Sequence, residues 1–355
     1  MRIVVAPDSF KGTLTAAEAA RALADGWLSV RPADEVVLRP MADGGEGTVD
    51  AFAELPGGQV RTVDVVGPTG APRVARWVML PDGTAVIELA ECCGLLLLDE
   101  PAPGEAHTLG FGLAIRAAIE AGASRLLLAI GGSASTDGGA GMLVGLGARL
   151  LDEGGAEVAA PGNATLRRIA TVDTSEMVAP PAGGAVILSD VDNPLLGERG
   201  AAAVFGPQKG GDPVVLEPGL AHFAGVLGGD PTAPGAGAAG GAGFALQWWG
   251  ALFSAGAEAV GEAVGLPAAA ETADLVITGE GALDAQTAAG KVVSYVRRVV
   301  GDSRTAVVAG RIDAEVDGFA GAVSLLELAG ESALTEPAWA ARAAGAHLAE
   351  RFATP

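Results

Sequence analysis

Residues 131–141 read GGSASTDGGAG and directly follow the apolar run of residues 126–130. Five of these eleven residues are glycine, and Asp137 is the one carboxylate among them. Backbone N–H groups that no side chain covers can approach an anion closely, and a carboxylate beside hydroxyl groups can hold a metal ion or a sugar-like hydroxyl. The loop therefore predicts a site for a phosphate or a small acid. Its candidate residues are Gly131, Gly132, Ser133 and Asp137.

Three loops near the two ends of the chain also combine charged residues with glycine. Residues 8–13 (DSFKGT) precede an expected helix, whose N-terminus adds partial positive charge for an anion. Residues 43–47 (DGGEG) offer two carboxylates, which suit Mg²⁺ or substrate hydroxyls. Residues 278–284 (TGEGALD) follow a short apolar run. The alternative for each loop is a turn whose charged side chains face water. The candidate residues in and just after these loops are Asp8, Ser9, Lys11, Asp43, Gly44, Gly45, Glu46, Thr278, Gly279, Glu280, Gly281, Asp284 and Lys291.

Two segments in the middle of the chain carry further candidates. Residues 189–194 (SDVDNP) place two aspartates two positions apart, so that Asp190 and Asp192 share one face if the segment is extended. Residues 204–211 (VFGPQKGG) place Lys209 in a loop that contains glycine. For all three residues, a solvated surface position is the alternative to a role in binding.

The composition argues against several classes of function. A formal net charge of −21 repels nucleic acids and anionic membranes. No stretch approaches the roughly 18 apolar residues that span a bilayer, and the apolar run at the N-terminus is too short for a signal peptide. Cys92 and Cys93 are adjacent, which is not the spacing of a metal site, and two buried thiols fit a reducing compartment. We therefore expect a cytoplasmic protein without nucleic-acid or membrane partners.

The two ends of the chain alternate strand, loop and helix, which is typical of a parallel α/β sheet. A capping-box pattern of Thr15 and Glu18 predicts a helix that extends to about residue 27. Further helices are expected near Thr48 and at residues 291–300. The five expected strands are residues 3–6, 36–38, 275–277, 305–309 and 322–326. Together they predict a flavodoxin-like doubly wound parallel sheet that is built from both chain ends.

The middle of the chain has a different pattern, with alternating strands first and mixed elements later. The expected elements are strands at residues 60–66, 74–80, 85–89, 126–130 and 186–188 and a helix at residues 108–121. Residues 228–243 are rich in glycine, alanine and proline and have the composition of a linker. We expect a first domain at residues 1–66 and 269–355, and a large inserted mixed α/β domain at residues 67–268.

Seven segments resemble, in the same order, those of the bacterial type-1 glycerate kinase family, and they extend over nearly the whole chain. They are APDSFKGT (6–13), MADGGEGT (41–48), IGGSASTDGGAGM (130–142), DVDNPLLG (190–197), VFGPQKG (204–210), PGAGAAGGAGF (234–244) and TGEGALDAQTAAGK (278–291). The resemblance replaces the linker interpretation of residues 228–243 with a family glycine loop. The chain departs from the family at Thr136, where Asn is common, at Cys92–Cys93, where Ala-Ser is frequent, and at Val292, where Pro is usual.

The resemblance implies an ATP-dependent kinase that phosphorylates D-glycerate, with 2-phosphoglycerate as the product. ATP and D-glycerate are then the partners, Mg²⁺ is the metal, and a homodimer is left open. Two domains that both carry such loops imply an active site in the cleft between them, which closes to exclude water.

The same resemblance implies roles for the charged residues, because phosphoryl transfer depends on positioning and on neutralising charge. The carboxylates that would bind Mg²⁺ are Asp190, Asp192 and Glu280. Two lysines, Lys11 and Lys209, would hold anionic groups, and an aspartate would accept the hydroxyl proton. The candidate catalytic residues are Asp8, Lys11, Asp43, Asp137, Asp190 and Lys209, with the proton acceptor left open among Asp8, Asp43 and Asp137.

Three other functions compete with this interpretation. A kinase of the same class would make 3-phosphoglycerate. A nucleotide-dependent oxidoreductase of small hydroxy acids would share the doubly wound sheet, but the first strand is not followed by the dinucleotide glycine pattern. A non-catalytic protein that binds small acids would not need the acidic loop at residues 278–284.

Replacing Lys11 tests the anion site at the start of the first helix. Lys11→Ala should lower kcat/KM by about tenfold or more, because a hydrogen bond to a charged group contributes roughly 1.5–3 kcal/mol. Steady-state kinetics of the folded variant provide the measurement. Unchanged kinetics would remove Lys11 from the site.

Overall fold

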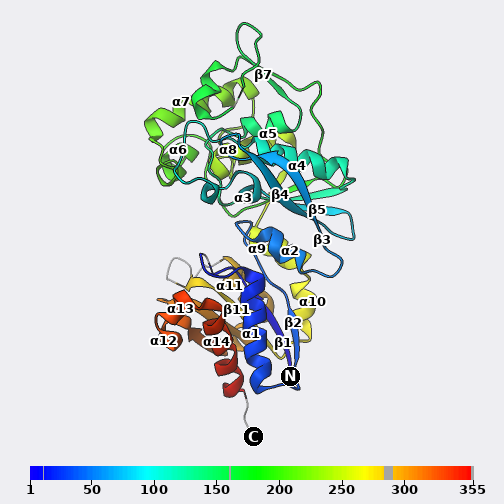
Figure 1. Ribbon diagram of the computed structural model, residues 1–355, viewed down its shortest axis with the longest axis vertical. Coiled ribbons are helices and arrows are strands. Elements are labelled where there is room, and N and C mark those ends of the chain that lie inside the picture. The colour runs from blue at the N-terminus through cyan, green and yellow to red at the C-terminus, as the bar shows by residue number, and fades with distance from the viewer. Residues whose placement is uncertain (11, 160, 284–290, 353–355) are drawn as a thin grey trace. The chain divides into compact units, whose positions relative to one another are not determined.

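The computed structural model describes residues 1–10, 12–159, 161–283 and 291–352. The chain forms two compact units (Figure 1). The first unit consists of Met1–Asp43, Asp50–Pro56 and Gly256–Pro355, and the second consists of Gly44–Val49 and Gly57–Ala255. Most of the second unit is therefore one long insertion in the first.

The first unit contains a five-stranded parallel sheet. Its strands are β1 (Arg2–Pro7), β2 (Glu35–Leu38), β11 (Leu275–Leu283), β12 (Thr305–Ile312) and β13 (Gly321–Ser324). The strand order is β13-β12-β11-β1-β2, and all neighbours are parallel. Numbered along the chain, this is the order 2-1-3-4-5 of a flavodoxin-like sheet, so the expected fold of the chain ends is confirmed.

The helices of the first unit include the first and the last helix of the chain. α1 (Ala16–Val30) begins at the expected capping box, in which the Thr15 hydroxyl accepts a hydrogen bond from Glu18 N and the Glu18 carboxylate accepts one from Thr15 N. It lies alongside α14 (Pro337–Arg351) (Figure 1), where a Cβ atom on Gly26 would lie only 1.9 Å from the Arg342 carbonyl oxygen. The other helices are α9 (Gly256–Ala263), α10 (Leu266–Glu271), α11 (Lys291–Val300), α12 (Leu325–Ala329) and α13 (Ser332–Thr335), with a 3-10 turn at Asp302–Arg304. α2 (Thr48–Ala53) contains the boundary between the units, after Val49.

The second unit contains a mixed six-stranded sheet in the order β10-β9-β6-β5-β4-β3. Its strands are β3 (Gln59–Val66), β4 (Pro72–Met79), β5 (Thr84–Glu88), β6 (Arg125–Ala129), β9 (Ala185–Leu188) and β10 (Leu252–Ser254). The first three are antiparallel, and the last three continue the sheet in parallel from β5. A two-stranded sheet of β7 (Arg149–Leu151) and β8 (Thr171–Asp173) was not expected from the sequence.

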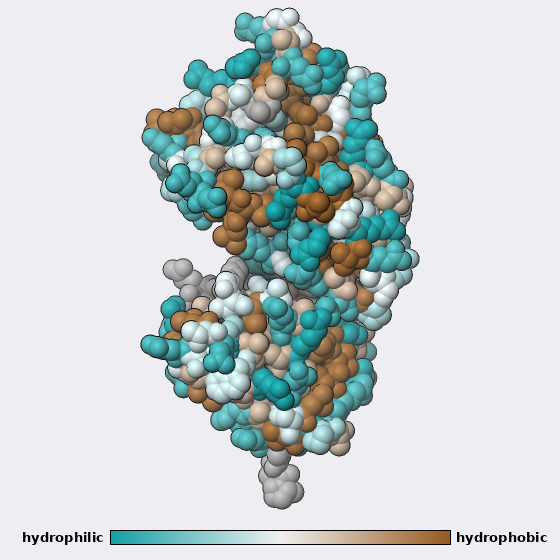
Figure 2. All heavy atoms as spheres, in the orientation of Figure 1, coloured by the Kyte–Doolittle hydropathy of each residue, from teal (hydrophilic) through white to brown (hydrophobic). Residues whose placement is uncertain are grey.

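Helices surround the second sheet. They are α3 (Leu89–Cys93), α4 (Leu109–Glu120), α5 (Ala140–Gly145), α6 (Ala201–Phe205), α7 (Pro213–Leu227) and α8 (Ala238–Trp249), with 3-10 turns at Leu95–Leu97, Asn163–Arg168 and Pro207–Lys209. α7 buries Leu220 and Phe223 in the core but exposes Val214 and Val215, and apolar atoms gather over this helix in Figure 2. No described helix is long and apolar enough to cross a membrane.

The unit boundaries differ from those expected at residues 66 and 268. β3 pairs with β4 along its whole length, from Gln59 opposite Met79 to Val66 opposite Pro72, so it belongs to the second unit. α9 belongs to the first unit, where Gly261 lies against the Tyr295 ring of α11. The alternating pattern of residues 60–66 predicts a strand but does not show which strand pairs with it. For this reason the sequence by itself places β3 in the first domain.

Two elements also differ from the expected ones within the units. β11 continues to Leu283, because β12 pairs with it as far as Ile312 opposite Leu283. β13 stops at Ser324, whose hydroxyl accepts a hydrogen bond from Glu327 N and so begins α12.

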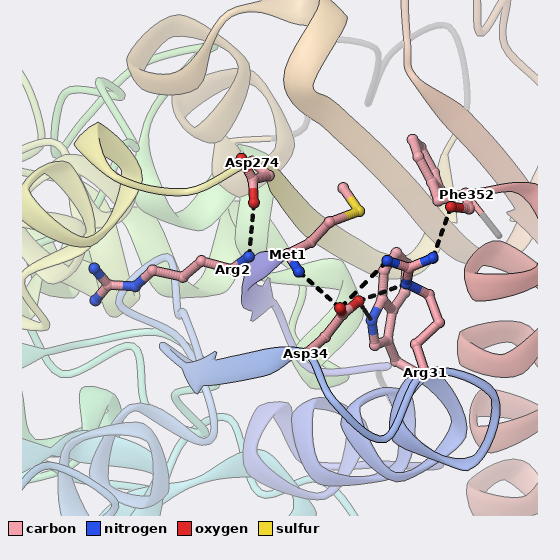
Figure 3. A network of polar contacts seen from close by, with 7 residues as sticks. Met1, Arg2, Arg31, Asp34, Asp274 and Phe352 are labelled. Atoms are coloured by element: carbon pink, nitrogen blue, oxygen red, sulfur yellow. Dashed lines mark hydrogen bonds and ion pairs between the residues drawn. The ribbon is translucent and has the colours of Figure 1, made fainter. Parts of the chain in front are cut away.

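Asp34 fixes the N-terminal strand, the end of α1 and the C-terminal helix at one place in the first unit (Figure 3). Its carboxylate accepts hydrogen bonds from Arg31 Nε at 2.5 Å and from Trp27 Nε1 at 3.0 Å, and the N-terminal ammonium lies 2.7 Å away. Arg31 also donates to the carbonyl oxygen of Phe352 at 2.7 Å. The hydrogen bond from Arg31 holds the pKa of Asp34 well below its usual range.

Asp34→Asn should therefore lower the free energy of unfolding at pH 7 by roughly 1.5–3 kcal/mol, the contribution of hydrogen bonds to a charged group. Because the pKa of Asp34 is lowered in the folded chain, its contribution is complete above the ordinary carboxyl pKa near 4 and is lost as the pH falls below that value. Urea unfolding at pH 7 and at pH 3 measures this difference. The control is Asp302→Asn, which removes an exposed pair with Arg297 and should change stability far less, because exposed ion pairs contribute little. Equal losses in both variants would contradict the prediction.

Candidate functional site

The carboxyl ends of β1, β2 and β11 meet at one edge of the first sheet. Pro7 of β1 lies opposite Gly279 of β11, and the next residue, Asp8, donates from its backbone N to Gly279 O at 2.8 Å. Met41, which follows β2, donates from its backbone N to Pro7 O at 2.9 Å. Asp8 is buried, and its carboxylate accepts a hydrogen bond from Ser9 N at 2.7 Å. The structure thus brings the segments of Asp8, Ser9 and Asp43 to the part of β11 around Gly279.

The third predicted loop is largely a strand. Glu280 lies opposite Ala309 of β12, and the pairing continues past Gly281 to Leu283. The bare backbone of Gly279 makes this possible, since a Cβ atom there would lie 2.0 Å from Val308 O. Thr278 is fully buried and donates from its hydroxyl to Ala6 O at 3.0 Å, so it joins β11 to β1; its role in ligand binding stays a prediction.

Three of the predicted residues lie outside the described residues or directly beside them. Lys11 and Asp284 lie outside the described residues. Lys291 is described only as the first residue of α11. Their assignment to the site stays a prediction.

In the second unit, two predicted glycine loops pack backbone against backbone. Gly131 N, just after β6, donates to Gly44 O at 3.0 Å, and a Cβ atom on Gly131 would lie 2.5 Å from the Cα of Gly45. A Cβ atom on Gly44 would lie 2.1 Å from Leu188 O at the end of β9. Only glycine allows this approach, so the glycines expected to face a ligand also hold the loops together. Glu46 lies at the same contact, next to Gly132.

Glu88 is a functional candidate that the sequence did not reveal. It ends β5, is buried, and accepts hydrogen bonds from Gly47 N at 3.1 Å and from Val49 N at 2.9 Å. It therefore fixes residues 44–49 to the carboxyl edge of the second sheet. A carboxylate that ends an otherwise apolar strand was the signal that could have identified it.

Asp137 is fully buried, and four donors surround its carboxylate. It accepts hydrogen bonds from Thr108 N at 2.8 Å, from the Thr108 hydroxyl at 2.7 Å, and from Gly139 N and Gly141 N at 3.2 and 3.1 Å. The Thr108 hydroxyl accepts in turn from Met142 N at 2.8 Å. These bonds connect the starts of α4 and α5, so they favour Asp137 as a positioning residue over Asp137 as the acceptor of a substrate proton.

Lys209 is a buried amine beside the same glycine-rich loop. Lys209 is the last residue of the 3-10 turn Pro207–Lys209 and is only 2% exposed. Lys209 Nζ donates to Ser133 Oγ at 2.7 Å and to Ser135 O at 2.6 Å. Burial lowers the pKa of Lys209 to about 7, and the charge of Asp137 opposes this shift. A lysine with this pKa can gain or lose a proton near neutral pH.

The start of α8 lies against this loop and has a strained backbone. Ala239 has a φ of +53°, which is unfavourable for a residue with a Cβ atom, and Gly240 and Gly241 continue in the left-handed region. Gly138 N donates to Gly240 O at 3.0 Å, and a Cβ atom on Gly240 would lie 2.0 Å from Ser135 O. The structure thus places the glycine-rich segment 234–244 beside the loop of Ser133, Ser135 and Asp137, where a linker would not pack.

The structure gives the two aspartates after β9 different surroundings. Asp190 is partly buried, and its Oδ2 atom is inaccessible to water. The side chain of Asp192 is 75% exposed and pairs with Arg199 at 3.2 Å. The two carboxylates therefore have unequal surroundings, unlike the matched pair that an extended segment would make. In the part of the chain that the structure describes, no three acidic, histidine or cysteine side chains form a group that could hold a metal ion.

Comparisons with known proteins extend over almost the whole chain. The model of the glycerate kinase family matches residues 3–352. A glycerate kinase of Bacillus subtilis is 43% identical over 337 residues, which are 91% of this chain and 86% of the relative. A glycerate 2-kinase of Escherichia coli is 42% identical over 306 residues, which are 82% of this chain and 80% of the relative.

A solved structure is similar to the chain as well. It comes from Salmonella typhimurium LT2 and carries the provisional name glycerate kinase 2. It is 37% identical in sequence, with a TM-score of 0.85, over 99% of this chain and 98% of the other. Since sequence and fold agree along almost all of its length, the chain belongs to the glycerate kinase family.

Proposed function

We propose that the chain transfers the γ-phosphoryl group of ATP to the 2-hydroxyl of D-glycerate and forms 2-phosphoglycerate. The observation that carries this proposal is the family match over residues 3–352. The name of the E. coli relative, glycerate 2-kinase, supports the choice of the 2-hydroxyl. We further propose a cytoplasmic location, and the homodimer stays open.

Charged residues at the two sheet edges suit the demands of phosphoryl transfer, which are positioning and charge neutralisation. In the second unit, Lys209 and Ser133 form a polar cluster beside a glycine-rich loop. In the first unit, Asp8 and Asp43 follow β1 and β2. Because the Asp137 carboxylate is occupied by backbone and hydroxyl donors, we propose that Asp8 or Asp43 accepts the proton of the glycerate hydroxyl. That loops of both units act on the same substrates stays a prediction.

The carboxylates fit a magnesium ion that arrives with ATP. Mg²⁺ usually keeps several waters and needs only one or two protein carboxylates beside the phosphates, so a ready-made cluster of three is not required. We propose Asp190 and Glu280 as these ligands, whereas the exposed pairing of Asp192 with Arg199 makes Asp192 the weaker candidate. When bound, Mg²⁺ neutralises charge on the phosphate oxygens.

The product assay tests the proposed function directly. D-glycerate, ATP and Mg²⁺ should yield ADP and 2-phosphoglycerate, identified by ³¹P and ¹H NMR. A phosphate on the 3-hydroxyl would show that the enzyme forms 3-phosphoglycerate instead. Binding of glycerate without ATP consumption would favour a non-catalytic protein, and oxidation of NADH with hydroxypyruvate would favour an oxidoreductase.

Substitutions at the two aspartates after β9 test the metal assignment. Asp190→Asn should lower kcat by at least about tenfold, which is roughly 1.4 kcal/mol of transition-state stabilisation, and higher Mg²⁺ should recover part of the loss. Asp192→Asn removes an exposed ion pair of the same segment and should cost much less. Initial rates across a series of Mg²⁺ concentrations measure both effects. A larger loss in the Asp192 variant would reverse the assignment.

A further inference from the structure

Ser133 lies between the exposed backbone of Gly132 and the buried amine of Lys209. Ser133 is 7% exposed, whereas Lys209 is 2% exposed. The serine oxygen accepts the hydrogen bond from Lys209 Nζ at 2.7 Å. Both residues are buried, and Ser133, which directly follows the exposed Gly132, keeps slightly more exposure than Lys209.

The proton on Lys209 determines what the Ser133 hydroxyl can offer. A protonated amine only donates, so it occupies a lone pair of the serine oxygen and leaves the hydroxyl hydrogen available to a ligand. A neutral amine has a lone pair of its own, which can accept the hydroxyl hydrogen. The serine then turns lone pairs toward a ligand, and these repel an anionic oxygen. Binding an oxyanion at Ser133 consequently favours the protonated lysine.

The surroundings of Lys209 leave both protonation states accessible. The charge of Asp137 acts on the amine and favours the proton. Its carboxylate is engaged by Thr108, Gly139 and Gly141, so it is no direct partner of Lys209. Burial acts in the opposite direction and brings the pKa of Lys209 to about 7.

We propose that the Ser133 hydroxyl contacts an anionic oxygen of a substrate, and that Lys209 is a positioning residue that takes up one proton from solvent when this oxygen binds. The proposal rests on the proposed function, whose substrates are both anions. The oxygen belongs to the glycerate carboxylate or to a nucleotide phosphate, and the two ligands are tested separately.

Isothermal titration calorimetry in buffers of different ionisation enthalpy counts the protons taken up on binding. For the ligand that reaches Ser133, more proton should be taken up at pH 8 than at pH 6, because a group with a pKa of about 7 is mostly neutral at the higher pH. D-glycerate and ADP are titrated in separate experiments. Uptake with D-glycerate alone identifies the carboxylate, and uptake with ADP alone identifies the phosphate.

Two serine variants that keep the lysine provide a matched pair. Ser133→Ala removes the hydroxyl that Lys209 contacts and should abolish proton uptake and weaken binding at pH 6 by about tenfold. Ser135→Ala should preserve both, since Ser135 contacts Lys209 through its backbone oxygen and its own hydroxyl has no hydrogen-bond partner in the described chain. Loss of uptake in the Ser135 variant as well would overturn the role of the Ser133 hydroxyl.

Two lysine variants separate the charge from the packing. In the wild type, ligand binding should weaken from pH 6 to pH 8, because Lys209 must first take up a proton. Lys209→Arg keeps a permanent charge, so its affinity should be the same at both pH values and no proton should be taken up. Lys209→Met should bind weakly at both values. Should these variants fail to fold, the serine pair still decides the outcome.

The wild-type titrations distinguish this inference from the proposed function. If the enzyme forms 2-phosphoglycerate but neither ligand brings proton uptake at pH 8, the inference is wrong and the proposed function stands. Proton uptake without any phosphorylated product would leave the anion contact in place and refute the kinase activity.

Discussion

The pairing of β1 with β11 is the contact on which the first unit depends. It places Ile3 opposite Leu275, so β1 and the central strand β11 pair although the whole second unit separates them in the sequence. The cost of closing so long a loop rises slowly with its length, and the buried strands of a parallel sheet offset it. The same register fixes Asp8 beside Gly279, and this gives the candidate catalytic edge its geometry.

The second unit depends on backbones that approach each other more closely than side chains would permit. Gly44, Gly131 and Gly240 each lie where a Cβ atom would overlap a neighbouring chain segment. Such contacts leave little room for side-chain hydrogen bonds, and Asp137 supplies several of them through one carboxylate. Glycine is required at these positions, because only a residue without a Cβ atom lets the loops pack backbone against backbone.

A buried lysine next to neutral oxygens is costly, because its charge loses the solvation of water without a contacting carboxylate to replace it. Lys209 tolerates this position because Ser133 Oγ and Ser135 O accept its hydrogen bonds and Asp137 lies near enough to favour the charge. A buried charge without a contacting carboxylate responds strongly to an anion that binds nearby. The burial that destabilises the ammonium group thus also makes its protonation depend on a bound anion.

The sequence by itself determined the five-stranded sheet, the capping box of α1 and the order of the glycine-rich loops, because strand–loop–helix periodicity and capping residues act over short distances. The resemblance carried by those loops also identified the family. Only the tertiary structure decided that β3 joins the second sheet, that Thr278 bonds to Ala6 O, and that Asp192 faces solvent while Asp190 is partly buried. It also revealed Glu88 and the burial of Lys209. A local sequence pattern indicates what chemistry a residue can perform. The partner of that residue and its exposure to water depend on segments that are distant in the sequence.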